Sequence, residues 1–264
     1  MDVIGVFINL DRSPERRATM EAQLRAYGLA NRYRRFPAID GADGQRACFQ
    51  SHIAALEGAA AGHAVHVMED DVLLSGYAPQ VVDYVVSTGV LDRFDIVLTE
   101  TLIGPDALEL RELKKLFDRH RTDETFEVRD VTSTYQCGMT SYLVGASKKT
   151  RVLSALHGGL DSGLPCDLLL RREARAGRLT LGCVFPFVTS FQLELESTRR
   201  GQDDKARNSK RAFDLLRYSF FVDCDHALAE KTAAALQQPA PADPHQKLIS
   251  GVLSFVASDQ FVTF

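Results

Sequence analysis

Strand-like and helix-like segments alternate along the N-terminal part of the chain, and this alternation restricts the possible folds more than any other feature. Four runs are rich in β-branched and other apolar residues, as expected for buried strands; they span residues 3–10, 35–39, 64–68 and 94–98. Segments with apolar residues at helical spacing lie between them, at about residues 13–28, 47–61 and 79–88. Strands that alternate with helices form mainly parallel sheets. The sequence therefore predicts an α/β fold with a mostly parallel central sheet flanked by helices.

The second half of the chain continues this pattern and then changes. We expect helices at residues 108–120, 149–156 and 167–176, and strands at residues 141–144 and 183–188. Beyond about residue 199 the pattern becomes helical, and a proline-rich stretch at residues 238–244 precedes an apolar tail. We predict an α/β domain over residues 1–199 and a helical C-terminal extension over residues 200–264.

The composition is that of an ordinary globular protein. Of 264 residues, 45% are hydrophobic and 25% are charged, and the formal net charge is −4. Basic residues do not gather into the broad positive face typical of nucleic-acid-binding proteins, so we set nucleic acid aside as a partner. Met1 and Asp2 lead directly into a strand-like run, without the segments typical of a secretory signal. We therefore expect a cytoplasmic protein, and contact with the inner face of the inner membrane stays open.

The five cysteines are widely separated and form no Cys-x-x-Cys pair; they are Cys48, Cys137, Cys166, Cys183 and Cys224. Their odd number and their spacing suit neither a disulfide framework nor a zinc site. We interpret them as reduced cysteines that pack as small hydrophobic residues.

Three adjacent carboxylates, Glu69, Asp70 and Asp71, directly follow the third predicted strand. Such groups repel one another unless a cation or several hydrogen-bond donors offset their charge. Mg²⁺ or Mn²⁺ prefers oxygen ligands and keeps positions open for phosphate oxygens. In an extended segment, Glu69 and Asp71 point to one side and Asp70 to the other. The alternative interpretation is a solvated turn whose carboxylates cap the next helix.

Polar residues also follow the first two predicted strands. Asn9 and Asp11 come after the first strand, and Asp40 comes after the second. The carboxyl ends of parallel strands meet at one edge of the sheet, where the ligands of such sheets bind. We therefore expect these residues and the acidic triplet to converge on one site.

Four segments carry a resemblance to a known family, and they occur in the order FINLDRSPERRATMEAQL, FPAIDG, ACFQSHIAAL and HVMEDDVLL. Together they resemble the N-terminal half of glycosyltransferase family 25, which shows an Asn-Leu strand end, an Asp-Gly, a Cys-x-x-Ser-His and a Glu-Asp-Asp. The resemblance continues more weakly through SYLVGASKKTRVL, LPCDLLL and FPFVTSFQLELEST, so it covers roughly residues 3–199. One departure is the stretch Gln45-Arg46-Ala47, where many members have Glu-Ile-Gly.

Members of this family build sugars of the bacterial lipopolysaccharide core, and relatives act on collagen hydroxylysine. The resemblance implies a nucleotide-diphospho-sugar transferase with a GT-A-like fold, in which the acidic motif holds Mn²⁺ or Mg²⁺ and the diphosphate. The metal offsets the charge that grows on the leaving diphosphate. In this chain the resemblance makes Asp71 the firmest metal ligand and places Glu69 on the metal or the ribose. Asp70 then lies next to the residues that contact the metal, without contacting the metal itself.

The resemblance also implies contacts with the nucleotide-sugar donor. They come from the first two loops and from the start of the second helix, and the residues are Asn9, Leu10, Arg12, Arg16, Asp40, Ser51 and His52. Each contact has a plainer alternative, namely solvated arginines beside a capped helix, a simple turn at Asp40, or a core histidine at His52. His63 and His66 match no family motif, and we interpret them as structural.

The family inverts the anomeric carbon, so a carboxylate should remove the proton of the acceptor hydroxyl. Asp167 is the main candidate, because it lies at a predicted helix start facing the carboxyl edge of the sheet. The alternative is a first-turn acid stabilised by the helix dipole. Glu194 and Glu196 are reserve candidates. Gln192 and Ser197 match a family Gln and Ser, and are candidates for contacts with phosphate or metal-bound water.

Two functions of different classes follow from the resemblance. The first is an active transferase that moves a hexose, galactose or glucose, from a UDP-sugar to a lipid-linked lipopolysaccharide or lipooligosaccharide acceptor. The second is a transferase-like module that binds a nucleotide-sugar or glycan without turnover. Glu69, Asp71 and Asp167 are all present, which favours the first. Transfer to collagen belongs to the secretory pathway, and the sequence shows neither a signal segment nor an ER-retention tail, so the bacterial saccharide is preferred.

The tail beyond the proline-rich stretch carries an apolar stripe if it is helical, formed by Leu248, Ile249, Val252, Leu253 and Val256. Such a stripe requires a covering surface. It can pack on the catalytic domain, bury against a second subunit in a homodimer, or lie on the inner membrane. Few basic residues accompany it, which makes the membrane the least favoured of the three.

Overall fold

The computed structural model describes residues 3–104, 107–193 and 213–236. Its central sheet contains β1 (Val3–Asn9), β2 (Tyr33–Pro37), β3 (Ala64–Glu69), β5 (Ile96–Leu98), β6 (Glu127–Asp130), β7 (Ser141–Val144) and β8 (Leu181–Phe185). The seven strands lie in the order β2-β1-β3-β7-β5-β8-β6. The pairings give β1, β2, β3, β5 and β8 one direction and give β6 and β7 the opposite one. The predicted α/β class is confirmed, with a mixed sheet in which most strands are parallel.

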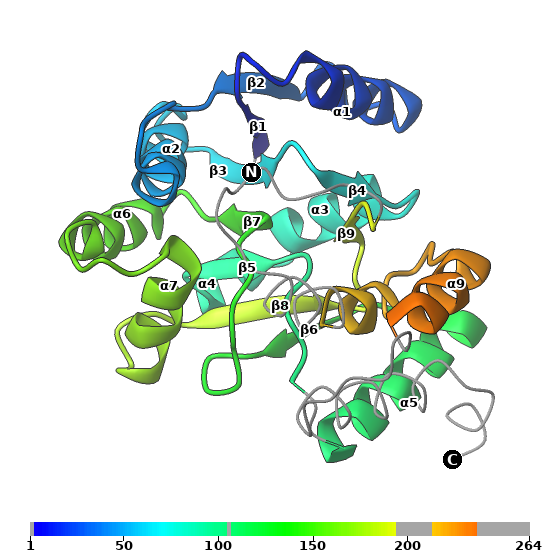
Figure 1. The fold of residues 1–264 in the computed structure, drawn as a ribbon. Coiled ribbons are helices and arrows are strands. Elements are labelled where there is room, and N and C mark those ends of the chain that lie inside the picture. The colour runs from blue at the N-terminus through cyan, green and yellow to red at the C-terminus, as the bar shows by residue number, and fades with distance from the viewer. Residues whose placement is uncertain (1–2, 105–106, 194–212, 237–264) are drawn as a thin grey trace.

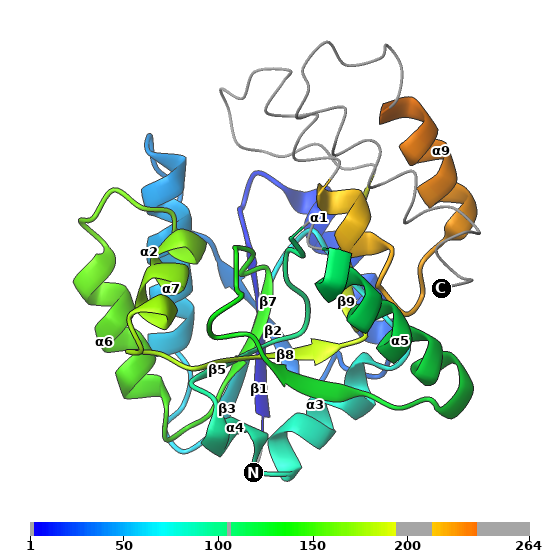
Figure 2. The same cartoon turned by 90° about the horizontal axis from the view of Figure 1, so that it is seen from below.

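Helices cover both faces of this sheet. They are α1 (Pro14–Ala26), α2 (Gly44–Glu57), α3 (Ala78–Ser87), α4 (Val90–Arg93), α5 (Ala107–Asp123), α6 (Lys149–Gly159), α7 (Cys166–Arg175) and α9 (His226–Leu236), with a further helical stretch at residues 213–218. Figure 1 shows α2, α6 and α7 together on one side of the sheet, and Figure 2 shows the same grouping from below. None of the helices in the described ranges is long and apolar enough to cross a membrane.

The side chains of β1 divide between the two faces and so show where α1 and α2 pack. Val6 and Ile8 belong to the hydrophobic cluster that includes Phe49 of α2. Phe7 lies between them in sequence and joins the cluster that includes Met20 of α1. The alternation places α1 and α2 on opposite faces of the sheet.

The chain reverses its direction of travel across the sheet at β1. From β1 it passes through α1 to β2 on one side, and from β2 it passes through α2 to β3 on the other side of β1. A sheet of this kind has a crevice outside the carboxyl ends of its strands at such a switch point, and ligands bind there. The topology therefore predicts a ligand-binding crevice at the carboxyl ends of β1 and β3.

Two short strands depart from the sequence-based prediction. β4 (Val72–Leu74) pairs antiparallel with β9 (Thr189–Phe191) and forms a separate two-stranded sheet. The strand predicted over residues 183–188 is present as β8, but its bounds were wrong, because β8 starts at Leu181 and ends at Phe185. Pro186 follows, and its missing N–H cannot continue the ladder of hydrogen bonds.

The start of the second helix and the existence of one edge strand were also not predicted. The second helix begins at Gly44 and not at residue 47, because the Asp43 side chain caps it by accepting hydrogen bonds from the N–H groups of Gln45 and Arg46. Strand β6 was missed, since its sequence Glu-Val-Arg-Asp has no apolar run. It lies at the edge of the sheet, where charged side chains are tolerated and discourage further pairing.

The described part of the predicted C-terminal extension shares the core of the α/β domain. Leu216 and Phe220 join the hydrophobic cluster that contains Phe187, and the Phe187 N–H donates to the Phe220 carbonyl at 3.0 Å. The division of the chain at residue 199 stays a prediction. The proline-rich stretch 238–244 and the tail 245–264 lie outside the described residues.

Gly5 in β1 lies against the ring of Tyr33, its partner residue in β2. A Cβ atom at position 5 would lie 2.1 Å from the ring carbon Cδ1 of Tyr33. Tyr33 cannot easily move, because it is buried and its hydroxyl contacts Nδ1 of His66 at 2.6 Å. The structural interpretation of His66 thus agrees with its place in this buried contact.

We expect Gly5→Ala to lower the free energy of unfolding by about 1–3 kcal/mol, since overpacking a filled site forces side chains and backbone to shift. Urea denaturation of the full chain measures the change. Gly158→Ala in α6 is the matched control, because a Cβ there meets no atom within 4 Å. Equal effects of the two substitutions would contradict the steric explanation.

Candidate functional site at the carboxyl edge of the sheet

An open pocket of about 740 Å³ lies at the carboxyl ends of β1, β2 and β3. Its size is within the usual range for small-molecule sites. The structure brings together here nine of the residues that the sequence analysis selected: Leu10, Arg12, Arg16, Asp40, Ser51, His52, Glu69, Asp70 and Asp71. Asn9 at the end of β1 is 1% exposed and lies beneath them.

Asp70 is held in place from two sides. The Asn9 amide donates to its Oδ2 at 2.6 Å, and Arg16 in the first turns of α1 donates to its Oδ1 at 3.1 Å. Arg16 also lies 3.6 Å from the Asp71 carboxylate. One buried amide and one guanidinium therefore offset part of the repulsion within the triplet, and they fix its middle member.

These contacts only partly compensate the negative charge of the Asp71 carboxylate. Its Oδ1 is buried and accepts no hydrogen bond from any described residue, while the side chain as a whole is 29% exposed. Burial, the largest cause, and then the charge of Glu69 raise the pKa of Asp71 to about 7, while the charge of Arg16 opposes this rise. An anion in this position gains more from a bound cation than an exposed carboxylate does.

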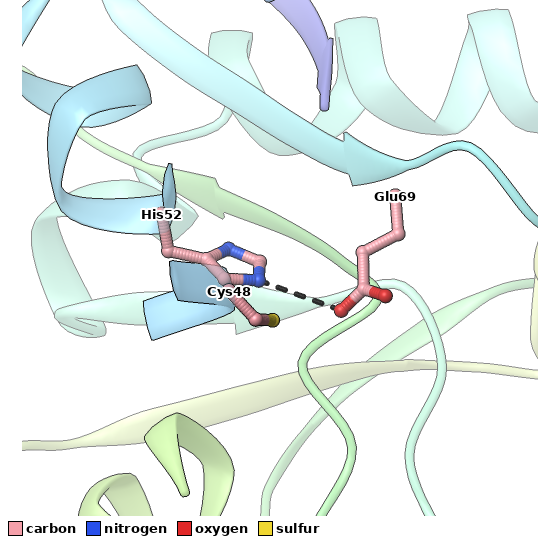
Figure 3. Close-up of side chains that lie close together, drawn as sticks. All are labelled: Cys48, His52 and Glu69. Atoms are coloured by element: carbon pink, nitrogen blue, oxygen red, sulfur yellow. Dashed lines mark ion pairs between the residues drawn. The ribbon is translucent and has the colours of Figure 1, made fainter. Parts of the chain in front are cut away.

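Glu69 faces a histidine and a cysteine from α2. Its Oε1 lies 3.4 Å from Nε2 of His52, and Figure 3 shows the Cys48 sulfur beside this pair. His52 is 2% exposed, and its Nδ1 lies 3.2 Å from the hydroxyl of Tyr142. Burial lowers the pKa of His52, but hydrogen bonds with Cys48 and Glu69 and their charges outweigh burial and raise the pKa to about 10. The contacts with Glu69 and Cys48 therefore favour the protonated form of His52.

Ser51 and the loop that precedes α2 also line the pocket. The Ser51 hydroxyl accepts a hydrogen bond from the Ile39 N–H at 2.8 Å and donates to the Ala47 carbonyl at 2.8 Å. Ser51 thus anchors the loop that carries Asp40. At the rim, Asp40 forms an ion pair with Arg12, and more than half of each side chain is exposed. The first and second loops are linked across the pocket entrance by this pair.

Asp167 occupies the first turn of α7, outside the set of residues that line the pocket. Its Oδ1 accepts from the Leu168 N–H at 2.9 Å and its Oδ2 accepts from the Gly138 N–H at 3.3 Å. Two residues further along, the Thr140 carbonyl accepts a hydrogen bond from the Glu69 N–H at 2.7 Å. The loop 138–140 therefore connects Asp167 to the acidic triplet.

The remaining predicted site residues follow β9. The Gln192 N–H lies 3.4 Å from the Asp71 carbonyl, so the backbone of Gln192 reaches the acidic triplet. Glu194, Glu196 and Ser197 lie outside the described residues.

A buried ion pair that the sequence did not predict lies next to this site. Arg217 lies 2.8 Å from the Glu100 carboxylate, and both side chains are almost fully buried. The guanidinium also stacks 4.2 Å from the centre of the Phe191 ring, and its charge opposes the rise in the pKa of Asp71. Glu100 follows the end of β5, so the rule that selected Asn9 and Asp40 would also have found Glu100. Arg217 carries no comparable signal.

The place of Cys48 among the polar residues of the site was also not predicted from the sequence. This cysteine was interpreted as a small hydrophobic residue, yet its sulfur belongs to a group with His52 and Glu69 whose ligand atoms lie within 4.8 Å of one another. The available signal was the spacing Cys-x-x-x-His, which places two metal-binding side chains one turn apart on the same helix face.

The raised pKa of Asp71 predicts a pH-dependent contribution to stability. Its folded-state pKa is about 7 against an ordinary value of 3.8, so at intermediate pH the folded chain holds a proton that the unfolded chain has lost. Stability from this group therefore falls as the pH rises from about 4 through about 7. We expect the unfolding free energy of the wild type, minus that of Asp71→Asn, to decrease over this interval in metal-free buffer. Urea denaturation at several pH values measures it, and a constant difference would contradict the assignment.

The described structure is thus an α/β protein with an acidic pocket at the switch point of its sheet. Comparison of the chain with protein-family models gives no match, and comparison with curated proteins gives no significant match. The function is therefore inferred from the site itself and from the motifs in the sequence.

Proposed function

We propose that this protein is a metal-dependent glycosyltransferase similar to those of glycosyltransferase family 25, with a GT-A-like fold. It transfers a hexose, galactose or glucose, from a UDP-sugar to a saccharide acceptor of lipopolysaccharide or lipooligosaccharide, with inversion at the anomeric carbon. The observation that carries this proposal is the pair of carboxylates, Glu69 and Asp71, in the wall of the pocket at the carboxyl end of β3. Nucleotides bind at this edge of α/β sheets.

The donor set of the pocket fits Mn²⁺ or Mg²⁺. The buried Oδ1 of Asp71 has no hydrogen-bond partner among the described residues, and the Glu69 carboxylate is close enough to raise the pKa of Asp71. Hard divalent ions prefer such oxygen ligands. When bound, the ion supplies Lewis-acid stabilisation of the charge on the leaving diphosphate.

The residues around the pair have distinct parts in this proposal. Asn9 and Arg16 hold Asp70 and so fix the backbone between Glu69 and Asp71. Arg12, exposed at the rim, is placed to meet a phosphate group that enters the pocket. Asp40 and the loop anchored by Ser51 form the wall that faces the nucleotide.

Asp167 is the proposed general base. It takes the proton of the acceptor hydroxyl while that oxygen attacks the anomeric carbon and the bond to the diphosphate breaks. Its link to Glu69 through the loop 138–140 supports a place beside the donor pocket. Glu194 is the alternative base.

A binding module without turnover is the second candidate function. It is favoured by one observation: both carboxylate oxygens of Asp167 already accept backbone hydrogen bonds, one from Leu168 in α7 and one from Gly138 in the loop 138–140. A carboxylate held in this way matches a first-turn acid stabilised by the helix dipole as well as it matches a base.

Thermal unfolding of the full chain with UDP, UDP-galactose and UDP-glucose, each with and without Mn²⁺, tests the proposed donor site. A ligand that binds only the folded chain raises the midpoint by an amount that grows with the logarithm of one plus the ratio of ligand concentration to Kd, so the correct donor should raise it only when Mn²⁺ is present. No shift with any nucleotide would contradict the proposal. A shift without hydrolysis of the donor or transfer to a lipooligosaccharide acceptor would instead establish the binding module.

We also propose that the reaction takes place in the cytoplasm, on a lipid-linked acceptor at the inner face of the inner membrane. Self-association through the C-terminal extension is the proposed quaternary contact. Sedimentation of the full chain alone tests self-association, and sedimentation with liposomes tests contact with the membrane.

A further inference from the structure

Cys48, His52 and Glu69 form a cluster, called here the thiol-imidazole cluster, on one wall of the pocket. Each residue offers one ligand atom, and the three atoms lie within 4.8 Å of one another. Cys48 and His52 project from the same face of α2 toward the end of β3, as Figure 3 shows. Cys48 is half-buried and lines the pocket, so the cluster is reachable from solvent.

We propose that the thiol-imidazole cluster is a binding site for a borderline-soft divalent metal ion, with Zn²⁺ as the ion it suits best. Thiolate and imidazole ligands favour zinc, whereas Mn²⁺ and Mg²⁺ favour oxygen ligands alone. Three protein ligands leave a fourth position open toward the pocket, as in zinc sites that bind water or an exogenous group.

The distances are close to those that zinc requires. Bonds of about 2.0–2.3 Å in a tetrahedral site separate the ligand atoms by roughly 3.3–3.6 Å. His52 Nε2 and Glu69 Oε1 already lie 3.4 Å apart. The sulfur therefore needs to approach by at most about 1.5 Å from the 4.8 Å limit of the cluster.

The surroundings of the cluster hold the His52 ring in position and fix the backbone of Glu69. The Tyr142 hydroxyl contacts His52 Nδ1 at 3.2 Å, which directs Nε2 toward Glu69. The Glu69 N–H is fixed at the end of β3 by the Thr140 carbonyl. A partner on the second ring nitrogen of a ligating histidine, as Tyr142 is here, orients the ligand, and its loss typically changes metal affinity by about 10- to 100-fold.

The site shares Glu69 with the proposed Mn²⁺ site, and this has a consequence that depends on the proposed function. A zinc ion that occupies Cys48, His52 and Glu69 withdraws Glu69 from the oxygen-ligated ion and places a second positive charge beside it. Zinc should therefore compete with Mn²⁺-dependent donor binding. The zinc site itself does not depend on the identity of the donor.

Titration of the full chain with Co²⁺ under reducing conditions tests the site directly, because Co²⁺ substitutes for zinc and reports thiolate ligation through a charge-transfer band. We expect one equivalent of Co²⁺ to produce this band together with the visible absorption of a tetrahedral site, and Zn²⁺ to displace it. Absence of the band from the wild type would overturn the proposal.

Cys48→Ser should abolish the charge-transfer band and weaken zinc binding by at least about 10-fold, because the loss of a ligand exceeds the loss of an orienting partner. Cys137→Ser is the matched control, since Cys137 is also a half-buried free cysteine but lies outside the cluster. The charge-transfer band of Cys137→Ser should equal that of the wild type. A band that persists in Cys48→Ser, or disappears in Cys137→Ser, would contradict the assignment of the ligand.

A measurement on the wild type covers the case in which Cys48→Ser does not fold. Zn²⁺ should slow alkylation of Cys48 by iodoacetamide, mapped by mass spectrometry, while alkylation of Cys137 stays the same. Equal rates at Cys48 with and without zinc would overturn the proposal. Mn²⁺-dependent UDP binding without a cobalt band would contradict this inference alone, and a cobalt band without any nucleotide binding would contradict only the proposed transferase.

Discussion

Asp71→Asn is expected to weaken Mn²⁺-dependent UDP binding by about 100-fold or more while leaving the protein folded. Asn has nearly the same shape as Asp, but it removes the anionic oxygen that would bind the ion, and hard divalent ions depend on such oxygens. A direct ligand should matter at least as much as an orienting partner, whose loss costs up to about 100-fold. Because burial and Glu69 raise the pKa of Asp71 to about 7, removing this charge should not destabilise the fold at neutral pH.

Isothermal titration with UDP, in the presence and absence of Mn²⁺, measures this effect. Asp92→Asn is the matched control, since Asp92 is an exposed carboxylate in α4, which leads into the opposite, amino end of β5. Asp92→Asn should bind UDP with the affinity and the Mn²⁺ dependence of the wild type. Wild-type Mn²⁺ dependence in Asp71→Asn would exclude Asp71 as a ligand and would favour Glu69 with a different partner.

Asp167→Asn is expected to preserve UDP-sugar binding and to reduce transfer by about 10²- to 10⁴-fold, the usual effect of losing a general base. The Asn side chain retains one carbonyl oxygen that can accept the hydrogen bond from Leu168 or Gly138 at the start of α7. The fold should therefore change little. The loss should appear in kcat and not in the binding constant of the donor.

Transfer of labelled hexose to a lipooligosaccharide acceptor, together with donor titration, separates the two quantities. Asp161→Asn serves as the control, because Asp161 is an exposed acid in the loop before α7 and pairs with Arg46 at the surface. Transfer at the wild-type rate in Asp167→Asn would move the role of base to Glu194 or Glu196. A wild-type chain that binds the donor but never transfers would support the binding module.

The sequence predicted the order and type of most elements, because each carries its own periodicity. The run over residues 64–68 alternates between the two faces as buried strands do, and Met20 and Leu24 recur at helical spacing in α1. It also located much of the pocket, since polar residues at the ends of parallel strands must meet at one edge. Asn9, Asp40 and Glu69 needed no further information to be selected.

Only the tertiary structure decided which strands are neighbours and which residues from distant segments meet. β7 inserts antiparallel between β3 and β5, although nothing in its four buried residues specifies a direction. Arg217 comes from a segment far along the chain and meets Glu100 across the core. Pairing of this kind depends on how whole elements pack, and local sequence carries no record of it.

The thiol-imidazole cluster shows the same division within one site. The sequence placed Cys48 and His52 one turn apart on a helix, which fixes their common face but not what that face meets. The packing of α2 beside the end of β3 then brought Glu69 within 3.4 Å of His52. The periodicity of a helix determines which side chains lie together on one element. The contact between two elements is set by the shape and burial of the surfaces that pack. The packing of α2 against the end of β3 therefore decided the chemistry of the pocket wall.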